Sequence, residues 1–383
     1  MDRHVSLLVE AVLGDFSHPM PVTLTELQRI PTSGARAVEP FTVGGAQFLA
    51  IPQLALDIPG QVPHMNGGDS DTELLLLRRT GGEFVEWAGL PAPGGEDAEF
   101  FTIGDRAFLA VASIRSGAGP YEFTTQSQIF TWDHDRFVPF QSITTFAAKQ
   151  WKYWTIDDRH FLGLAQGVQV PGMEGSNRDS MVYEWNGESF VEQQPIPSLW
   201  AYNWHPFVVG STHFVAHAEH LGESMLYRWD GRQLVPHQTL AVRAGRAFAS
   251  FDRDGGSYLV VASLVEPPRV MRWDAGRFDD VQELEGLGAR ELAVVSLSGR
   301  LFVVRINFIL GTPADPHPVM DSQVYEWDSG ALCVVAEFPT CGGTDVGVIV
   351  DGDELQLAVS NSLSPELRFA NETVLYSMSI KAA

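Results

Sequence analysis

The stretch "MVYEWNGESFVEQQPIPS", residues 181–198, decides the fold because the chain repeats it. A similar stretch, "MLYRWDGRQLVPHQTLAV", occupies residues 225–242, and a third begins with "QVYEWDSG" at residue 323. The apolar residue five positions after the Trp recurs every 44 to 54 residues, as Phe84, Phe137, Phe190, Leu234, Phe278 and Leu332. Self-similarity at such a period indicates a repeat architecture.

Each copy contains four short strand-like segments separated by Gly, Asn-Gly, Asp-Gly or Pro turn signals, which predicts one propeller blade of four antiparallel strands. Residues 22–31 match only the segment that follows the YxW strand, and residues 373–378 match only the YxW strand itself. We therefore expect the two ends of the chain to build one blade together. The sequence predicts an all-β, seven-bladed β-propeller over residues 22–383, closed so that no sheet edge stays open. Residues 1–21 form an extension with apolar residues at helical spacing, which predicts a short helix or a tail.

Composition limits the partners. The formal net charge of the 383 residues is −23, so nucleic acid is not an expected partner, because phosphate contacts need clustered Lys and Arg. No apolar run is long enough to span a membrane. Only two cysteines are present, Cys333 and Cys341, and we expect free thiols. Without a recognisable signal peptide, a cytoplasmic monomer is expected, with secretion as the alternative.

The chain resembles the epilepsy-associated repeat, or epitempin (EPTP), family, whose repeats occur in the leucine-rich glioma-inactivated proteins. The resemblance rests on Y-x-W-x-G-x-x-F, followed by Q-x-[I/L]-P, W-x-x-F and F-L-A-V, over roughly residues 22–380. It implies a seven-bladed propeller used mainly for extracellular protein recognition. It also implies a calcium ion in the central channel, held by Asp-x-Glu pairs on neighbouring inner strands.

Long loops are expected on one face of the propeller. The turns that follow the W-x-x-F strand and the YxW strand are minimal, whereas the segments that lead into the YxW strand are long in blades 1, 2, 3 and 6. These segments include residues 53–71 in blade 1. Because irregular loops on a rigid scaffold commonly carry binding sites, this face is the expected binding face.

The W-x-x-F strands should line the central channel. We align them on Phe41, Phe101, Trp154, Phe207, Phe251, Val295 and Val348. Four residues earlier stand Ala37, Asp97, Gln150, Asn203, Ala247, Glu291 and Thr344. Two residues earlier stand Glu39, Glu99, Lys152, His205, Ala249, Ala293 and Val346. Both positions point the same way in a strand, so the channel should be polar along blades 1 to 4 and mostly small or apolar along blades 5 to 7.

The carboxylates of Glu39, Asp97 and Glu99 should converge in this channel. Three such groups repel one another unless a proton or a cation intervenes, and Ca²⁺ prefers oxygen ligands. The alternative is an ion pair between Glu99 and Lys152 in a water-filled channel. Gln150 and Asn203 are candidate ligand-binding residues, and no organic cofactor is indicated.

Two further sets of side chains suggest other roles. Trp200 and Tyr202 could stack on a ligand or simply pack. Glu39, Glu99, Lys152, His205 and Tyr153 could serve as acids and bases of an enzyme at the channel mouth, of the lyase, hydrolase or cyclase type. The leading hypothesis is a recognition propeller that engages a protein partner or a small ligand on the long-loop face, with this enzyme as the alternative.

Overall fold

The computed structural model describes residues 22–170, 177–351 and 354–380. The extension of residues 1–21 lies outside the described residues, as does part of the blade 3 loop. Within the described residues the strands form seven four-stranded antiparallel sheets, which are the blades of a β-propeller. The fold predicted from the sequence is therefore confirmed.

The innermost strand of each blade is the W-x-x-F strand. These strands are β2 (Glu39–Val43), β6 (Gly95–Ile103), β10 (Ala148–Ile156), β14 (Ala201–Val209), β18 (Gly245–Arg253), β22 (Ala289–Leu297) and β28 (Gly343–Asp351). Each contacts the next in this order, and β28 contacts β2, so the ring is closed. The second strands are β3 (Ala46–Ile51), β7 (Arg106–Ser113), β11 (Arg159–Gln166), β15 (Thr212–Glu219), β19 (Gly256–Ser263), β23 (Arg300–Asn307) and β29 (Glu354–Asn361).

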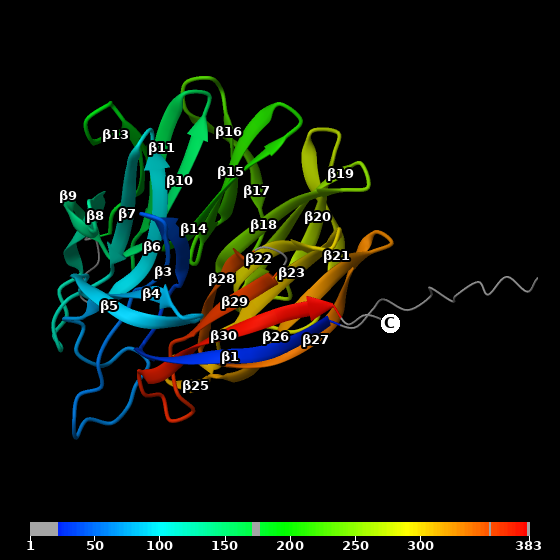
Figure 1. Cartoon of the computed structure of the whole chain (residues 1–383). Coiled ribbons are helices and arrows are strands. Elements are labelled where there is room, and N and C mark those ends of the chain that lie inside the picture. The colour runs from blue at the N-terminus through cyan, green and yellow to red at the C-terminus, as the bar shows by residue number, and fades with distance from the viewer. Residues whose placement is uncertain (1–21, 171–176, 352–353, 381–383) are drawn as a thin grey trace, which may run out of the picture.

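The two outer strands of each blade carry the repeated phrase. The third strands are β4 (Glu73–Thr80), β8 (Thr124–Asp133), β12 (Ser180–Trp185), β16 (Ser224–Trp229), β20 (Arg269–Asp274), β26 (Val319–Asp328) and β30 (Ala370–Ile380). The outermost strands are β5 (Glu83–Pro91), β9 (Arg136–Phe146), β13 (Phe190–Ile196), β17 (Leu234–Leu240), β21 (Arg277–Glu283), β27 (Ala331–Cys341) and β1 (Val22–Ser33). Figure 1 shows β1 lying against β30, so both ends of the chain share blade 7, as predicted.

A glutamine clamp explains why the phrase keeps its Gln. The Gln194 side chain donates to Leu234 O at 2.8 Å and accepts from Leu234 N at 2.9 Å, across the seam between neighbouring blades. Gln141 does the same to Phe190. The other clamps of this kind join Gln28 to Phe84, Gln238 to Phe278 and Gln282 to Leu332. Each clamp satisfies a backbone N–H and C=O that would otherwise lie unpaired at the seam.

The hydrophobic core is divided among the seams between blades. Trp151 packs with Phe101 and Phe108 of blade 2, and Trp204 packs with Trp154 of blade 3. Both Trp151 and Trp204 are almost fully buried. Burial of such large aromatic side chains gives each seam much of its stability.

The long loops emerge on one face, which we call the loop face, where second strands end and third strands begin; the opposite end is the turn face. The blade 1 and blade 2 loops are joined by Arg115, which donates to Asn66 O at 2.8 Å and Gly67 O at 2.6 Å. Its guanidinium group also lies 3.7 Å from the ring centroid of Tyr121. The blade 6 loop contains a small hairpin, β24 (Leu310–Thr312) and β25 (Asp315–His317).

Polar residues at the ends of the second strands hold the adjoining loops. Gln166 accepts from Phe146 N and donates to Asp179 O, and Glu219 accepts from the backbone N–H groups of Leu199 and Trp200. Cys333 and Cys341 are free thiols, as expected.

Candidate functional site

Six of the seven inner strands begin with an irregularity that shapes the axis. The pairing register shifts between Gly95 and Asp97 in β6, and between Ala148 and Gln150 in β10. Equivalent shifts occur in β14, β18, β22 and β28. Such a bulge leaves one or two residues outside the ladder and re-aims their side chains. Two consecutive residues can therefore both face the axis, which a regular strand would not allow.

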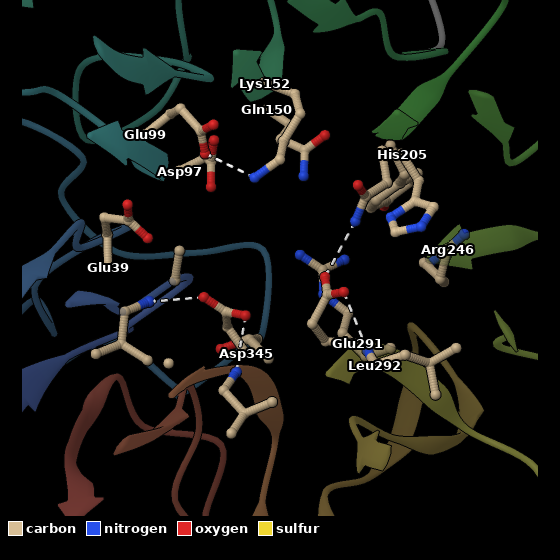
Figure 2. Close-up of a pocket in the computed structure, with 18 of the residues that line it drawn as sticks. Glu39, Asp97, Glu99, Gln150, Lys152, His205, Arg246, Glu291, Leu292 and Asp345 are labelled. Atoms are coloured by element: carbon tan, nitrogen blue, oxygen red, sulfur yellow. Dashed lines mark hydrogen bonds and ion pairs between the residues drawn. The ribbon is translucent and has the colours of Figure 1, made fainter. Parts of the chain in front are cut away.

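A cavity of about 530 Å³ lies on the axis, lined by residues that run from just before the start of the seven inner strands to their middle. Figure 2 shows side chains from different blades around this common space, among them Glu39, Lys152, His205, Arg246 and Asp345. Because the starts of the inner strands pair with the ends of the second strands, the first lining residues lie nearest the loop face.

Successive positions along the inner strands form three rings of side chains. The basic ring is nearest the loop face and consists of Arg36, Glu96, Lys149, Tyr202, Arg246 and Arg290. The acidic ring follows it directly and consists of Asp97, Gln150, Asn203, Glu291 and Asp345. The lower ring lies two residues further along and consists of Glu39, Glu99, Lys152 and His205.

The alignment of blade 7 made from the sequence is wrong by one residue. The residue that occupies the position of Asp97 is Asp345, not Thr344, because Asp345 follows the register shift in β28. Likewise Gly347, not Val346, occupies the position of Glu99. A slip of one residue exchanges the two faces of a strand. The sequence alignment therefore placed the Asp345 carboxylate on the face that points away from the axis. The polar channel consequently extends around to blades 6 and 7.

The structure brings most of the predicted site residues together. Glu39, Asp97, Glu99, Gln150, Lys152, Tyr202, Asn203 and His205 all line the cavity. Tyr153 and Trp200 do not line it. Tyr153 stacks on Phe101 in the seam between blades, and its hydroxyl lies 2.6 Å from His160 Nδ1. Trp200 packs against Tyr202 and His220.

The lower ring contains an ion pair. Lys152 Nζ lies 2.9 Å from Glu99 Oε2, and Glu99 Oε1 accepts from Tyr153 N at 3.0 Å. Glu39 Oε1 accepts from Phe100 N on the neighbouring blade at 3.2 Å. Burial, followed by repulsion from Glu99, raises the pKa of Glu39 well above its usual range. Burial alone would lower the pKa of Lys152, but Glu99 and Glu39 outweigh it and raise that pKa.

Side chains of the acidic ring join different blades, including blade 4 to blade 6 through Asn203 and Glu291. Asp97 Oδ2 accepts from Trp151 N at 2.8 Å, and Gln150 Oε1 accepts from Trp204 N at 2.6 Å. Asn203 donates to Glu291 Oε2 at 3.1 Å. Gln150 and Asn203, predicted as ligand-binding residues, thus have structural partners already.

The carboxyl groups of the acidic ring hold their protons unusually tightly. Burial, followed by repulsion from Asp345, raises the pKa of Glu291 to about 8. Burial also raises the pKa of Asp345 to about 6. Burial and repulsion from Glu99 raise the pKa of Asp97 well above its usual range. At neutral pH this ring therefore carries less negative charge than its composition suggests.

The three expected calcium ligands, Glu39, Asp97 and Glu99, make separate backbone hydrogen bonds and are not gathered into a metal site. Within the described residues, no group of three or more His, Cys, Asp or Glu side chains is gathered closely enough to hold a metal ion. Glu39, Asp97 and Glu99 each accept a backbone N–H from the next blade instead. The donor chemistry suits a hard cation, but ligation by all three would require the side chains to move together.

His205 is a neutral hydrogen-bonding group in this cavity. Its Nε2 lies 2.8 Å from Ser250 Oγ. Burial, followed by repulsion from Lys152, lowers the pKa of His205 to about 3. A histidine with so low a pKa is a weak base near neutral pH.

The sequence interpretation missed the basic ring. Arg36, Lys149, Arg246 and Arg290 each stand one residue before a position that had been assigned to the channel. This recurrence was visible in the alignment. In a regular strand Lys149, Arg246 and Arg290 would point away from the axis, and the bulges turn them towards it, whereas Arg36 lies just before β2.

The fold and the site together define a seven-bladed propeller with a charged axial cavity. The EPTP domain family model matches residues 24–68, 83–133, 136–186, 189–230 and 233–274, which is more than half of the chain. The chain therefore belongs to the EPTP family.

The chain is similar to parts of longer proteins. The human "Thrombospondin-type laminin G domain and EAR repeat-containing protein" is 30% identical over 175 residues, covering 45% of this chain and 24% of that protein. Human "Leucine-rich repeat LGI family member 2" is 25% identical over 233 residues, covering 59% of this chain and 38% of that protein. The chain thus matches well under half of the length of these relatives.

Among solved structures, the SapL1 lectin in complex with alpha methyl fucoside aligns with a TM-score of 0.47 and 12% identity, covering 79% of this chain and 96% of that chain. In the described part of the chain, no helix is long and apolar enough to cross a membrane. These comparisons give no support to the cytoplasmic location expected from the sequence, which stays a prediction.

Proposed function

We propose that this protein is a recognition propeller that binds a small ligand in the axial cavity, on the loop-face side. The observation that carries the proposal is the cavity of about 530 Å³, a size typical of small-molecule sites, with ionisable groups from several blades converging on it. Membership of the EPTP family is compatible with a binding role.

The enzyme alternative has weaker support. It would use Glu39, Glu99, Lys152, His205 and Tyr153. Lys152 is ion-paired with Glu99 and its pKa is raised, so it holds its proton at neutral pH. His205 is a weak base, because its pKa is lowered to about 3. Tyr153 stacks in a seam instead of lining the cavity. General acid–base catalysis needs groups that exchange protons near the working pH, and neither Lys152 nor His205 meets this condition.

A protein partner on the loop face is the second candidate. Large apolar side chains are exposed on several segments of this face: Leu56, Val62, Leu199, Leu221, Val265, Leu287, Leu310 and Val319. Val62 is 89% exposed on a loop that Arg115 holds in place. Exposed apolar groups on one face are a common feature of interaction surfaces. Val62→Asp should then abolish binding of such a partner, whereas Val281→Asp on the outer strand β21 should not.

A calcium ion bound at Glu39, Asp97 and Glu99 remains part of the proposal. Burial and mutual repulsion raise the pKa of Glu39 and of Asp97, and a divalent cation would favour their ionised forms. Such an ion would neutralise the acidic side of the cavity.

Native mass spectrometry of the protein purified from its own cells tests the ligand proposal. We expect a small molecule that stays bound to the folded parent chain and is released on denaturation. Ala37→Leu, which places extra volume in the cavity wall, should lose it, whereas Ala331→Leu on the outer strand β27 should keep it. A bare chain mass for the folded parent, or retention by Ala37→Leu, would contradict the proposal.

A further inference from the structure

The basic ring concentrates positive charge in an otherwise acidic protein. Four of the 25 Lys and Arg residues, namely Arg36, Lys149, Arg246 and Arg290, meet on the axis, although the formal net charge of the chain is −23. Their only carboxylate neighbour within the ring is Glu96. Clustered buried cations are costly unless an anion compensates them.

Glu96 cannot satisfy all four cations. Lys149 Nζ lies 3.2 Å from Glu96 Oε1 and donates to it. Arg36 Nε and Arg290 Nη2 are each 3.7 Å from a Glu96 oxygen, which is longer than a hydrogen bond. Burial works against ionisation of Glu96, but Lys149, Arg36 and Arg290 outweigh it and lower its pKa to about 2. One fully ionised carboxylate thus faces several cations.

Two arginine nitrogens of the ring are buried without a hydrogen-bond partner among the described residues. Within the described residues, Arg36 Nε and Arg246 Nε make no hydrogen bond and have almost no exposed surface. Arg246 is only 4% exposed, and its guanidinium carbon lies 3.9 Å from the ring centroid of Tyr202, which holds the group in place. Buried donors are normally satisfied, and an orphan donor costs free energy that a suitable acceptor would recover.

The positive charge of the basic ring lowers the pKa values of two neighbouring groups, Tyr202 and His220. Burial would raise the pKa of Tyr202, but Arg246, Lys149 and Arg290 outweigh it and lower that pKa to about 8. Burial, followed by Arg246, lowers the pKa of His220 to about 4. The adjacent acidic ring supplies limited compensation at neutral pH, because the pKa of Glu291 is about 8.

We propose that the basic ring is a subsite for the oxyanion group of a small ligand: a carboxylate, phosphate or sulfate. This inference rests on the proposed function, in which the cavity binds a ligand. Planar guanidinium groups match the geometry of such oxyanions. The side chains of Arg36, Lys149, Glu96 and Arg290 are only 2–11% exposed, so the anion must be small enough to enter the cavity.

Isothermal titration of the full chain with sodium sulfate, phosphate and acetate tests the subsite, with chloride keeping the ionic strength constant. We expect saturable binding of at least one of these ions, and the preferred ion identifies the oxyanion chemistry. Arg246→Met should weaken binding about 10- to 100-fold, as expected when one charge-assisted hydrogen-bond donor is lost. Arg253→Met is the matched control, because Arg253 lies at the exposed far end of the same strand β18. Arg36→Met serves as a second ring variant if Arg246→Met does not fold.

A spectroscopic readout separates local binding from a general salt effect. A bound oxyanion disfavours the phenolate, so the ionisation of Tyr202, followed by ultraviolet absorbance, should move to higher pH when the binding ion replaces chloride. No saturable binding of any of the three ions, or equal binding by the parent and Arg246→Met, overturns the subsite. If an oxyanion binds but no small molecule is found on the protein from its own cells, the subsite stands and the proposed function fails.

Discussion

Asp345 Oδ2 accepts a hydrogen bond of 2.8 Å from the backbone N–H of Val38, across the seam where the last blade meets the first. The other oxygen, Oδ1, accepts from Val346 N at 2.7 Å. Near the periphery the two chain ends are joined by the pairing of β1 with β30. Asp345 therefore holds the last inner strand, β28, to the segment that leads into the first, β2, at the axis. The pairing of β1 with β30 makes a second connection at the periphery.

Asp345→Ala should lower the free energy of unfolding by about 1–3 kcal/mol, because it leaves two buried backbone N–H groups without an acceptor. Relief of the repulsion between Asp345 and Glu291 offsets part of this loss. Urea unfolding checks the value, with Asp252→Ala, at an exposed position of β18, as the control. An unchanged midpoint for Asp345→Ala would show that this hydrogen bond contributes nothing to closure.

The glutamine clamps should each stabilise one seam. Gln194→Leu removes both hydrogen bonds to Leu234, and we expect it to lower the free energy of unfolding by about 1–2 kcal/mol, since the seam is only partly buried. Gln126→Leu on β8 is the control, because Gln126 bonds Thr144 at an exposed position. Equal losses in the two variants would argue against a special role for the clamp.

Stability should fall as the pH rises from 6.5 to 8. The pKa of Glu291 is about 8 in the folded protein and near 4.5 when unfolded, so the folded state holds the extra proton and loses this advantage as the pH rises. The histidines His205, His217 and His220 act in the opposite direction near pH 6.5, because their lowered pKa values leave them neutral in the folded protein while they still bind protons when unfolded, and this contribution fades as the pH approaches 8. Glu291→Gln cannot titrate, so its urea midpoint should change less with pH. Parallel pH profiles for the parent and the variant would refute this assignment.

Calcium should raise the melting temperature if it binds on the acidic side of the cavity, because a ligand of the folded state alone stabilises that state. Thermal melts with excess calcium and with a chelator provide the measurement. Asp97→Asn should reduce the difference, whereas Asp105→Asn, in a tight turn away from the axis, should not. Superimposable melts of the parent under both conditions would count against the ion.

The blades could be predicted from the sequence because the repeated residues make the repeated contacts. Gln141 and Phe190, for example, meet in the same clamp as Gln194 and Leu234. Blade 7 was misaligned because Val348 and Ile349 are adjacent apolar residues, and apolar character alone does not choose between them. The pairing of Val348 with Leu357 fixes the register.

The basic ring could not be derived from strand periodicity. Arg290 and Glu291 are consecutive, and a regular strand sends consecutive side chains to opposite faces. The register shift at this point of β22 lets both reach the cavity. The position of a bulge depends on how seven strands crowd around one axis, which is a property of the assembled fold and not of any single segment.

The most direct test of the axial cavity as a binding site is an anomalous diffraction map of crystals grown with selenate, a sulfate analogue whose selenium can be located. We expect a peak on the axis within hydrogen-bond distance of the arginines of the basic ring, including Arg36 and Arg246. Peaks confined to the protein surface, with only water on the axis, would contradict it.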